Sequence, residues 1–119
     1  MIKDKPAFFI SLGPACNVKW AIDTFIGSKE TLFFDWMMTN LKSVTQIIGC
    51  EDITKVISYE TVTQNPDKPH HSGHACMLIN SVDYCESIHD VPSNFSDNDI
   101  EDFIAKYRRR YYRIIDIIK

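Results

Sequence analysis

The 119-residue sequence is poor in glycine and contains no long hydrophobic run, and each shortage excludes a class of protein. Its four glycines rule out a collagen-like or glycine-rich chain. The longest apolar runs are only a few residues, far below the ~20 that a membrane-spanning helix needs. No Gly-x-Ser-x-Gly motif is present, which argues against a serine hydrolase built on a nucleophile elbow.

The sequence also lacks an excess of positive charge. Thirteen Lys and Arg residues face sixteen Asp and Glu residues, which leaves a net charge of −3. A nucleic-acid-binding domain normally carries a basic field, so we expect neither nucleic acid nor a membrane as a partner. At 45% hydrophobic residues the chain is too apolar for disorder, and its length fits a single domain over residues 1–119.

Cysteines are few, at positions 16, 50, 76 and 85. A chain with this much apolar content does not need disulfides to hold its core. The N-terminal residues Met1–Lys5 include an acid and precede an apolar run too short for a signal peptide. We therefore expect four reduced thiols and a cytoplasmic location.

One of these cysteines lies at the start of an expected helix. Residues Ala7–Leu12 read as a buried strand that Gly13-Pro14 ends. Apolar residues at helical spacing then follow Cys16, namely Val18, Ala21, Ile22 and Phe25. The positive end of a helix dipole favours the thiolate, the form of cysteine that attacks carbonyl carbon.

The order of short motifs resembles a known family. Ser11-Leu12-Gly13-x-x-Cys16, a helix, Phe34-Asp35-Trp36, His89-Asp90 and an Arg- and Tyr-rich helix over 106–111 follow one another here. This order is similar to that of the bacterial and viral family of papain-like cysteine peptidases called DUF1796. Phe33 stands where that family usually has proline. The resemblance implies a papain-like thiol hydrolase. Because family members usually continue beyond such a helix, it also implies a truncated copy, a fragment or a minimal version of that domain.

The resemblance makes Cys16 the candidate nucleophile and His89 the candidate base. A papain-like enzyme needs an imidazole that accepts the thiol proton and later protonates the leaving group. Asp35 is the candidate third residue, because neighbours on a strand point to opposite faces and Asp90 is therefore badly placed to orient His89. The alternatives are a buried cysteine, a histidine bonded to backbone and a turn aspartate.

A group of possible metal ligands lies in the segment from residue 70 to residue 76. His70, His71, His74 and Cys76 could bind zinc, with Cys85 and His89 nearby in sequence. Their spacing matches no zinc-finger pattern, so we expect no metal and no cofactor. His70 and His71 stay reserve candidates for the base.

The remaining pattern predicts an α/β or α+β domain. We expect a strand or extended segment over Thr31–Phe34 and a helix over Leu41–Ile48 capped by Thr39-Asn40, with Leu41, Val44, Ile47 and Ile48 on one apolar face. A short helix over Ile53–Ile57, with Asp52 or Glu51 near its start, should follow. A loop over Gln64–His74, two strands over Ala75–Ile79 and Val82–Ile88, and a long helix capped by Ser96 follow. An apolar stripe runs along this helix from Ile100 to Ile118.

The end of the long helix is rich in isoleucine, and its basic residues form one patch. We expect the apolar end, from Ile114 to Ile118, to form a homo-oligomer contact. Lys106, Arg108–Arg110 and Arg113 are interpreted as a solvated helix face that suits the helix dipole. The alternative to an enzyme is a non-catalytic α/β module that binds a protein partner.

Overall fold

The computed structural model describes residues 32–118. The predicted strand Ala7–Leu12, the turn and helix after it, and Cys16 lie outside the described residues. Within residues 32–118, no helix is both long enough and apolar enough to cross a membrane.

The described part of the chain is an antiparallel sheet with helices, which is an α+β fold. The strands are β1 (Met37–Thr39), β2 (Val62–Gln64), β3 (His70–His71), β4 (His74–Ile79) and β5 (Cys85–Pro92). They are ordered β1-β5-β4-β2, with β3 paired to β4, and each pairing is antiparallel. A doubly wound α/β sheet would instead be mainly parallel.

Two short helices connect β1 to β2, and both begin where the sequence predicts. Helix α2 (Leu41–Ile48) starts at Asn40, whose side-chain oxygen accepts a hydrogen bond from the Ser43 N–H at 2.9 Å. Helix α3 (Ile53–Val56) starts at Asp52 in the same way. The predicted apolar face of α2 is wrong at one position, because Leu41 is 77% exposed.

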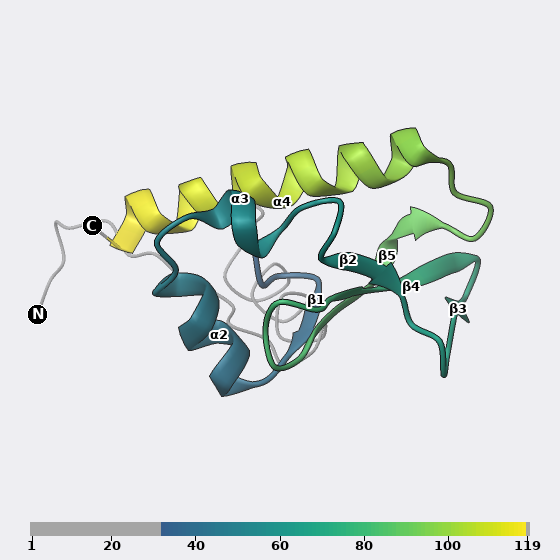
Figure 1. The fold of residues 1–119 in the computed structure, drawn as a ribbon, viewed down its shortest axis with the longest axis horizontal. Coiled ribbons are helices and arrows are strands. Elements are labelled where there is room, and N and C mark those ends of the chain that lie inside the picture. Colours follow the sequence, from purple (N-terminus) through teal and green to yellow (C-terminus); the bar gives the residue numbers. More distant parts are fainter. Residues whose placement is uncertain (1–31, 119) are drawn as a thin grey trace, which may run out of the picture.

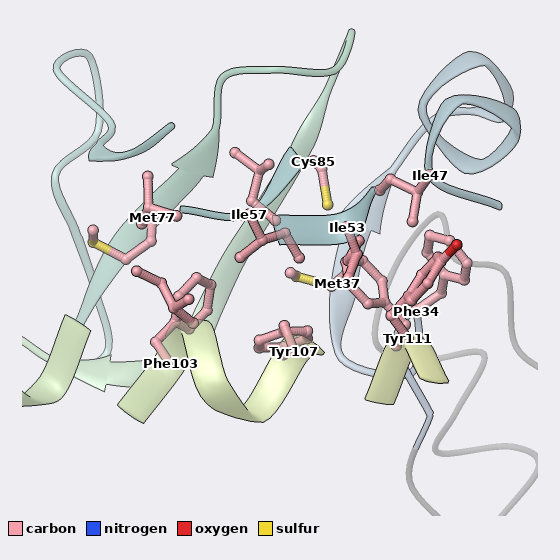
Figure 2. Packing of buried hydrophobic residues seen from close by; sticks show 14 of the residues in the cluster. Phe34, Met37, Ile47, Ile53, Ile57, Met77, Cys85, Phe103, Tyr107 and Tyr111 are labelled. Carbon is pink, nitrogen blue, oxygen red and sulfur yellow. The ribbon is translucent and has the colours of Figure 1, made fainter. Parts of the chain in front are cut away.

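The long helix α4 (Asp97–Ile118) runs along the sheet and supplies much of the core (Figure 1). Its first turn is held by Asp99, whose carboxylate accepts the Ser96 N–H at 2.8 Å. Figure 2 shows Phe103, Tyr107 and Tyr111 directed toward Met37 and the apolar residues around it. The predicted apolar stripe is buried at Ile100, Phe103, Ile104, Tyr107, Tyr111 and Ile114.

Two expectations about extended structure are wrong. Phe33 and Phe34 lie in a turn, and the strand begins only at Met37. Both rings are fully buried. These two aromatic residues, which favour β-strands, therefore pack in the core and do not pair along a strand. The predicted loop over Gln64–His74 also contains β3, because a two-residue turn lets His70–His71 pair with β4.

Candidate functional site

The histidine-rich segment forms a tight β-hairpin. His71 pairs with His74 across the turn Ser72-Gly73, and both turn residues have positive φ, 49° and 82°. Two-residue hairpin turns of type I′ require this conformation. Because paired residues on antiparallel strands share a face, the turn places His71 and His74 on the same face of the hairpin.

Strand β5 carries an irregularity opposite this hairpin. Ala75 pairs with Val91 and Met77 pairs with Ser87, so three residues of β5, 88–90, face Cys76 alone. The backbone N–H and C=O of Cys76 bond instead to Pro69 and Asn65, at 2.9 and 2.8 Å. A bulge of this kind changes the direction of the side chains it carries, and here it carries His89 and Asp90.

The bulge brings His89 into a cluster of aromatic rings. Its ring centroid lies 6.3 Å from that of His71, 6.3 Å from that of His74 and 6.4 Å from that of Trp36, each at a steep angle. His89 is exposed, and among the described residues its ring has contacts with other rings but no hydrogen bond. Within residues 32–118, the structure shows no hydrogen bond from the His89 ring to the backbone, which is the contact that the alternative interpretation of this residue requires.

Asp35 lies in the turn before β1, next to Trp36. Its carboxylate is 2% exposed and accepts the Leu32 N–H at 2.6 Å. The Asp35 N–H bonds back to the Leu32 carbonyl at 3.3 Å, so the residue closes the turn that carries Trp36. In the described part of the chain it is Trp36, the next residue, that contacts His89.

The three cysteines that the structure describes are parts of the core or its border. Burial raises the pKa of the Cys85 thiol to about 12. Burial, together with the nearby Glu86 charge, also raises the pKa of Cys76. The Cys50 thiol donates to the Tyr111 hydroxyl at 3.6 Å. Thiols whose pKa is raised by burial, as in Cys76 and Cys85, are poor nucleophiles.

Asp90 is the centre of a buried polar network that the sequence did not reveal. Its carboxylate accepts bonds from the Lys106 ammonium at 2.7 Å, from the Tyr107 hydroxyl at 2.6 Å and from the Ser87 hydroxyl. Burial alone would raise the pKa of Asp90, but these bonds outweigh it and hold the pKa below its ordinary value. No local pattern signals this network, because its partners come from a strand and a helix.

Most of the predicted basic patch is used inside the molecule. Lys106 bonds to Asp90, and the Arg108 guanidinium donates to the Ile57 and Thr54 carbonyls at the end of α3. The guanidinium carbon of Arg110 lies 5.0 Å from the centre of the Tyr107 ring. The interpretation as a solvated face is therefore wrong for these three side chains. Lys106 and Arg108 tie α4 to β5 and α3, and Arg110 packs against a ring of α4 itself.

The histidine-rich segment contains the possible zinc ligands that the sequence offers. As the side chains stand in residues 32–118, no three metal-ligating groups converge on a common point. The His74 ring nitrogen Nδ1 lies 3.2 Å from the Ser72 carbonyl oxygen, where it acts as the donor.

Comparison of the chain with protein-family models, with curated proteins and with solved structures gave no match.

Proposed function

We propose that the protein is a thiol hydrolase of the papain-like cysteine peptidase type, acting on an amide or related acyl bond in the cytoplasm. The observation that carries the proposal is the contact between His89 and Trp36. These residues belong to the His-Asp and Phe-Asp-Trp motifs, which are far apart in the sequence. Two motifs of the resemblance thus meet around one exposed imidazole.

The described cysteines support Cys16 as the nucleophile by elimination. Cys76 and Cys85 are buried with raised pKa values, and Cys50 is bonded to Tyr111. If the chain performs thiol chemistry, the remaining cysteine carries it, and its predicted place at a helix start favours the thiolate.

The proposed reaction uses His89 as the proton carrier. His89 takes the thiol proton of Cys16, the thiolate adds to the carbonyl carbon, and His89 returns the proton to the departing amine as the carbon–nitrogen bond breaks. Water then cleaves the thioester, giving one proton to His89, and the carboxylic acid leaves as Cys16 is restored. Asp35 contributes by closing the turn that holds Trp36 against the imidazole.

Alkylation of the four thiols by iodoacetamide at neutral pH, followed by mass spectrometry, tests this proposal. We expect Cys16 to react fastest, and His89→Ala to slow it by about tenfold, because an unassisted thiol is only a few per cent thiolate at this pH. His70→Ala is the matched control, since His70 is an exposed histidine one residue from the cluster.

Two outcomes contradict the proposal. If Cys16 is the slowest of the four thiols, it is not the nucleophile, and the alternative of a non-catalytic binding module is favoured. If His71→Ala slows Cys16 and His89→Ala does not, the base is His71.

A further inference from the structure

We propose that Asp90 is a positioning residue for His89, which it holds in place through the bulge of β5 by anchoring that bulge to α4. This inference rests on the proposed function only for its effect on Cys16. The anchoring itself concerns the described residues alone.

The bulge of β5 has few backbone contacts with the neighbouring strands. β1 pairs only with residues 85–87 of β5, and β4 pairs with Ser87 and Val91 but not with the three residues between them. Among residues 32–118, the segment 88–90 is therefore without ladder pairing on either side. Backbone of this kind needs another source of order.

The side chain of Asp90 holds the backbone of the bulge in place. Its side chain is 9% exposed and accepts hydrogen bonds from both Lys106 and Tyr107 on α4, as well as from Ser87 at the beginning of the bulge. Tyr107 is itself held rigidly, because it is fully buried and its ring packs edge-on against Phe33 at 5.2 Å. The carboxylate thus joins the bulge to a fixed point of the core.

His89 and Asp90 are adjacent in sequence but contact different parts of the molecule. Asp90 is directed to α4, and the His89 ring lies against Trp36, His71 and His74. His89 has ring contacts but no hydrogen bond among the described residues that would hold its imidazole. The position of its backbone therefore decides where the ring lies, and Asp90 sets that position.

Substitution of Asp90 tests the inference through two readouts. In Asp90→Asn and Asp90→Ala, we expect the imidazole resonances of His89 to lose the ring-current shift caused by Trp36, and those of His70 to stay unchanged. Alkylation of Cys16 should slow by about tenfold in Asp90→Ala, approaching His89→Ala, because small displacements of a catalytic group are costly. Asp90→Asn keeps an acceptor for Tyr107 and should lie between.

Glu86→Gln is the matched control. Glu86 is a buried carboxylate on the same strand, 6% exposed, but it bonds to Asn65 and Tyr84 rather than to α4. Its loss should destabilise the fold without moving the His89 resonances or the Cys16 rate. If Asp90→Ala fails to fold, Tyr107→Phe removes one anchor bond and should produce the same spectral change in smaller measure.

A double substitution separates positioning from general damage. Asp90→Ala combined with His89→Ala should react no more slowly than His89→Ala alone, because Asp90 acts through His89. Additive losses, or a folded Asp90→Asn with unchanged His89 resonances, would overturn the inference. If His89→Ala does not slow Cys16, the proposed function fails, and the His89 resonances still decide whether Asp90 positions the ring.

Discussion

At the scale of single residues, Asp90 and His89 are neighbours with opposite surroundings. Asp90 is buried against Lys106 and Tyr107, and His89 is exposed beside Trp36. A buried carboxylate is tolerated only when it is paired and hydrogen-bonded. An exposed imidazole can exchange protons with its surroundings. In the His89-Asp90 motif, Asp90 is thus a structural group, and His89 is the group that is accessible for proton transfer.

The lowered pKa of Asp90 predicts how stability depends on pH. Because this pKa is lower in the folded than in the unfolded chain, the stabilisation is complete above the ordinary aspartate pKa of about 4 and is lost as the pH falls through the folded-state value. Asp90→Asn should cost about 1–3 kcal/mol at pH 7. Urea denaturation at decreasing pH should show the wild type approaching the variant, and a constant difference would contradict this origin.

We expect the histidine cluster to bind no stoichiometric metal. The rings of His71 and His74 lie beside His89, yet no three ligands converge in the part of the chain that the structure describes. Elemental analysis of protein purified without a histidine tag should find less than one equivalent of zinc. One zinc per chain that disappears in His71→Ala or His74→Ala, but not in His70→Ala, would show the prediction to be wrong.

At the scale of elements, the β3–β4 hairpin decides which histidines meet. Its turn is also tied to the end of β5, because the Ser93 N–H bonds to the Gly73 carbonyl at 3.1 Å. Figure 1 shows the hairpin at the end of the sheet away from α2. The turn chemistry therefore controls the distance from His71 and His74 to His89.

The positive φ of both turn residues predicts opposite effects of two substitutions. Gly73→Ala should destabilise the protein by about 1 kcal/mol through backbone conformation alone, since an added Cβ would meet no atom within 4 Å. Ser72→Asn should stabilise it slightly, because Asn-Gly is the preferred pair for this turn. Thermal unfolding measures both, and equal effects of the two changes would contradict a type I′ turn.

At the scale of the whole molecule, α4 closes the core along its length and leaves its last turn partly uncovered. Ile114 is fully buried, whereas Ile118 is 52% exposed. An oligomer contact through this helix, which the sequence suggests, therefore cannot use Ile114. Ile118 and the half-exposed Tyr112 are the apolar side chains that this part of α4 presents.

Self-association is accordingly predicted to depend on Ile118. Sedimentation at high micromolar concentration should detect a dimer in the wild type that Ile118→Glu dissociates without loss of helix by circular dichroism. Ile114→Glu is the contrasting variant, because a charge at this buried position should unfold the protein. A wild-type chain that stays monomeric at these concentrations would remove α4 as an interface.

The sequence by itself determined the elements that short-range patterns mark, namely helix caps and helical periodicity. The pairs Thr39-Asn40 and Glu51-Asp52 marked the starts of α2 and α3 because a cap acts within three residues, and the structure places Asn40 and Asp52 at the caps. The periodic stripe of α4 identified its buried face. The short apolar runs of the sequence predict no membrane-spanning helix, and residues 32–118 contain no helix long and apolar enough to be one.

Tertiary structure alone decided the surroundings of the candidate site. Phe33 and Phe34 looked like strand residues, but burial against Tyr107 outweighed their β propensity. The ring cluster of His89 and the network of Asp90 depend on a bulge opposite Cys76 and on a helix packed across the sheet. A bulge changes pairing without a residue signature of its own, so contacts between distant segments, rather than the spacing of residues, determined which side chains meet.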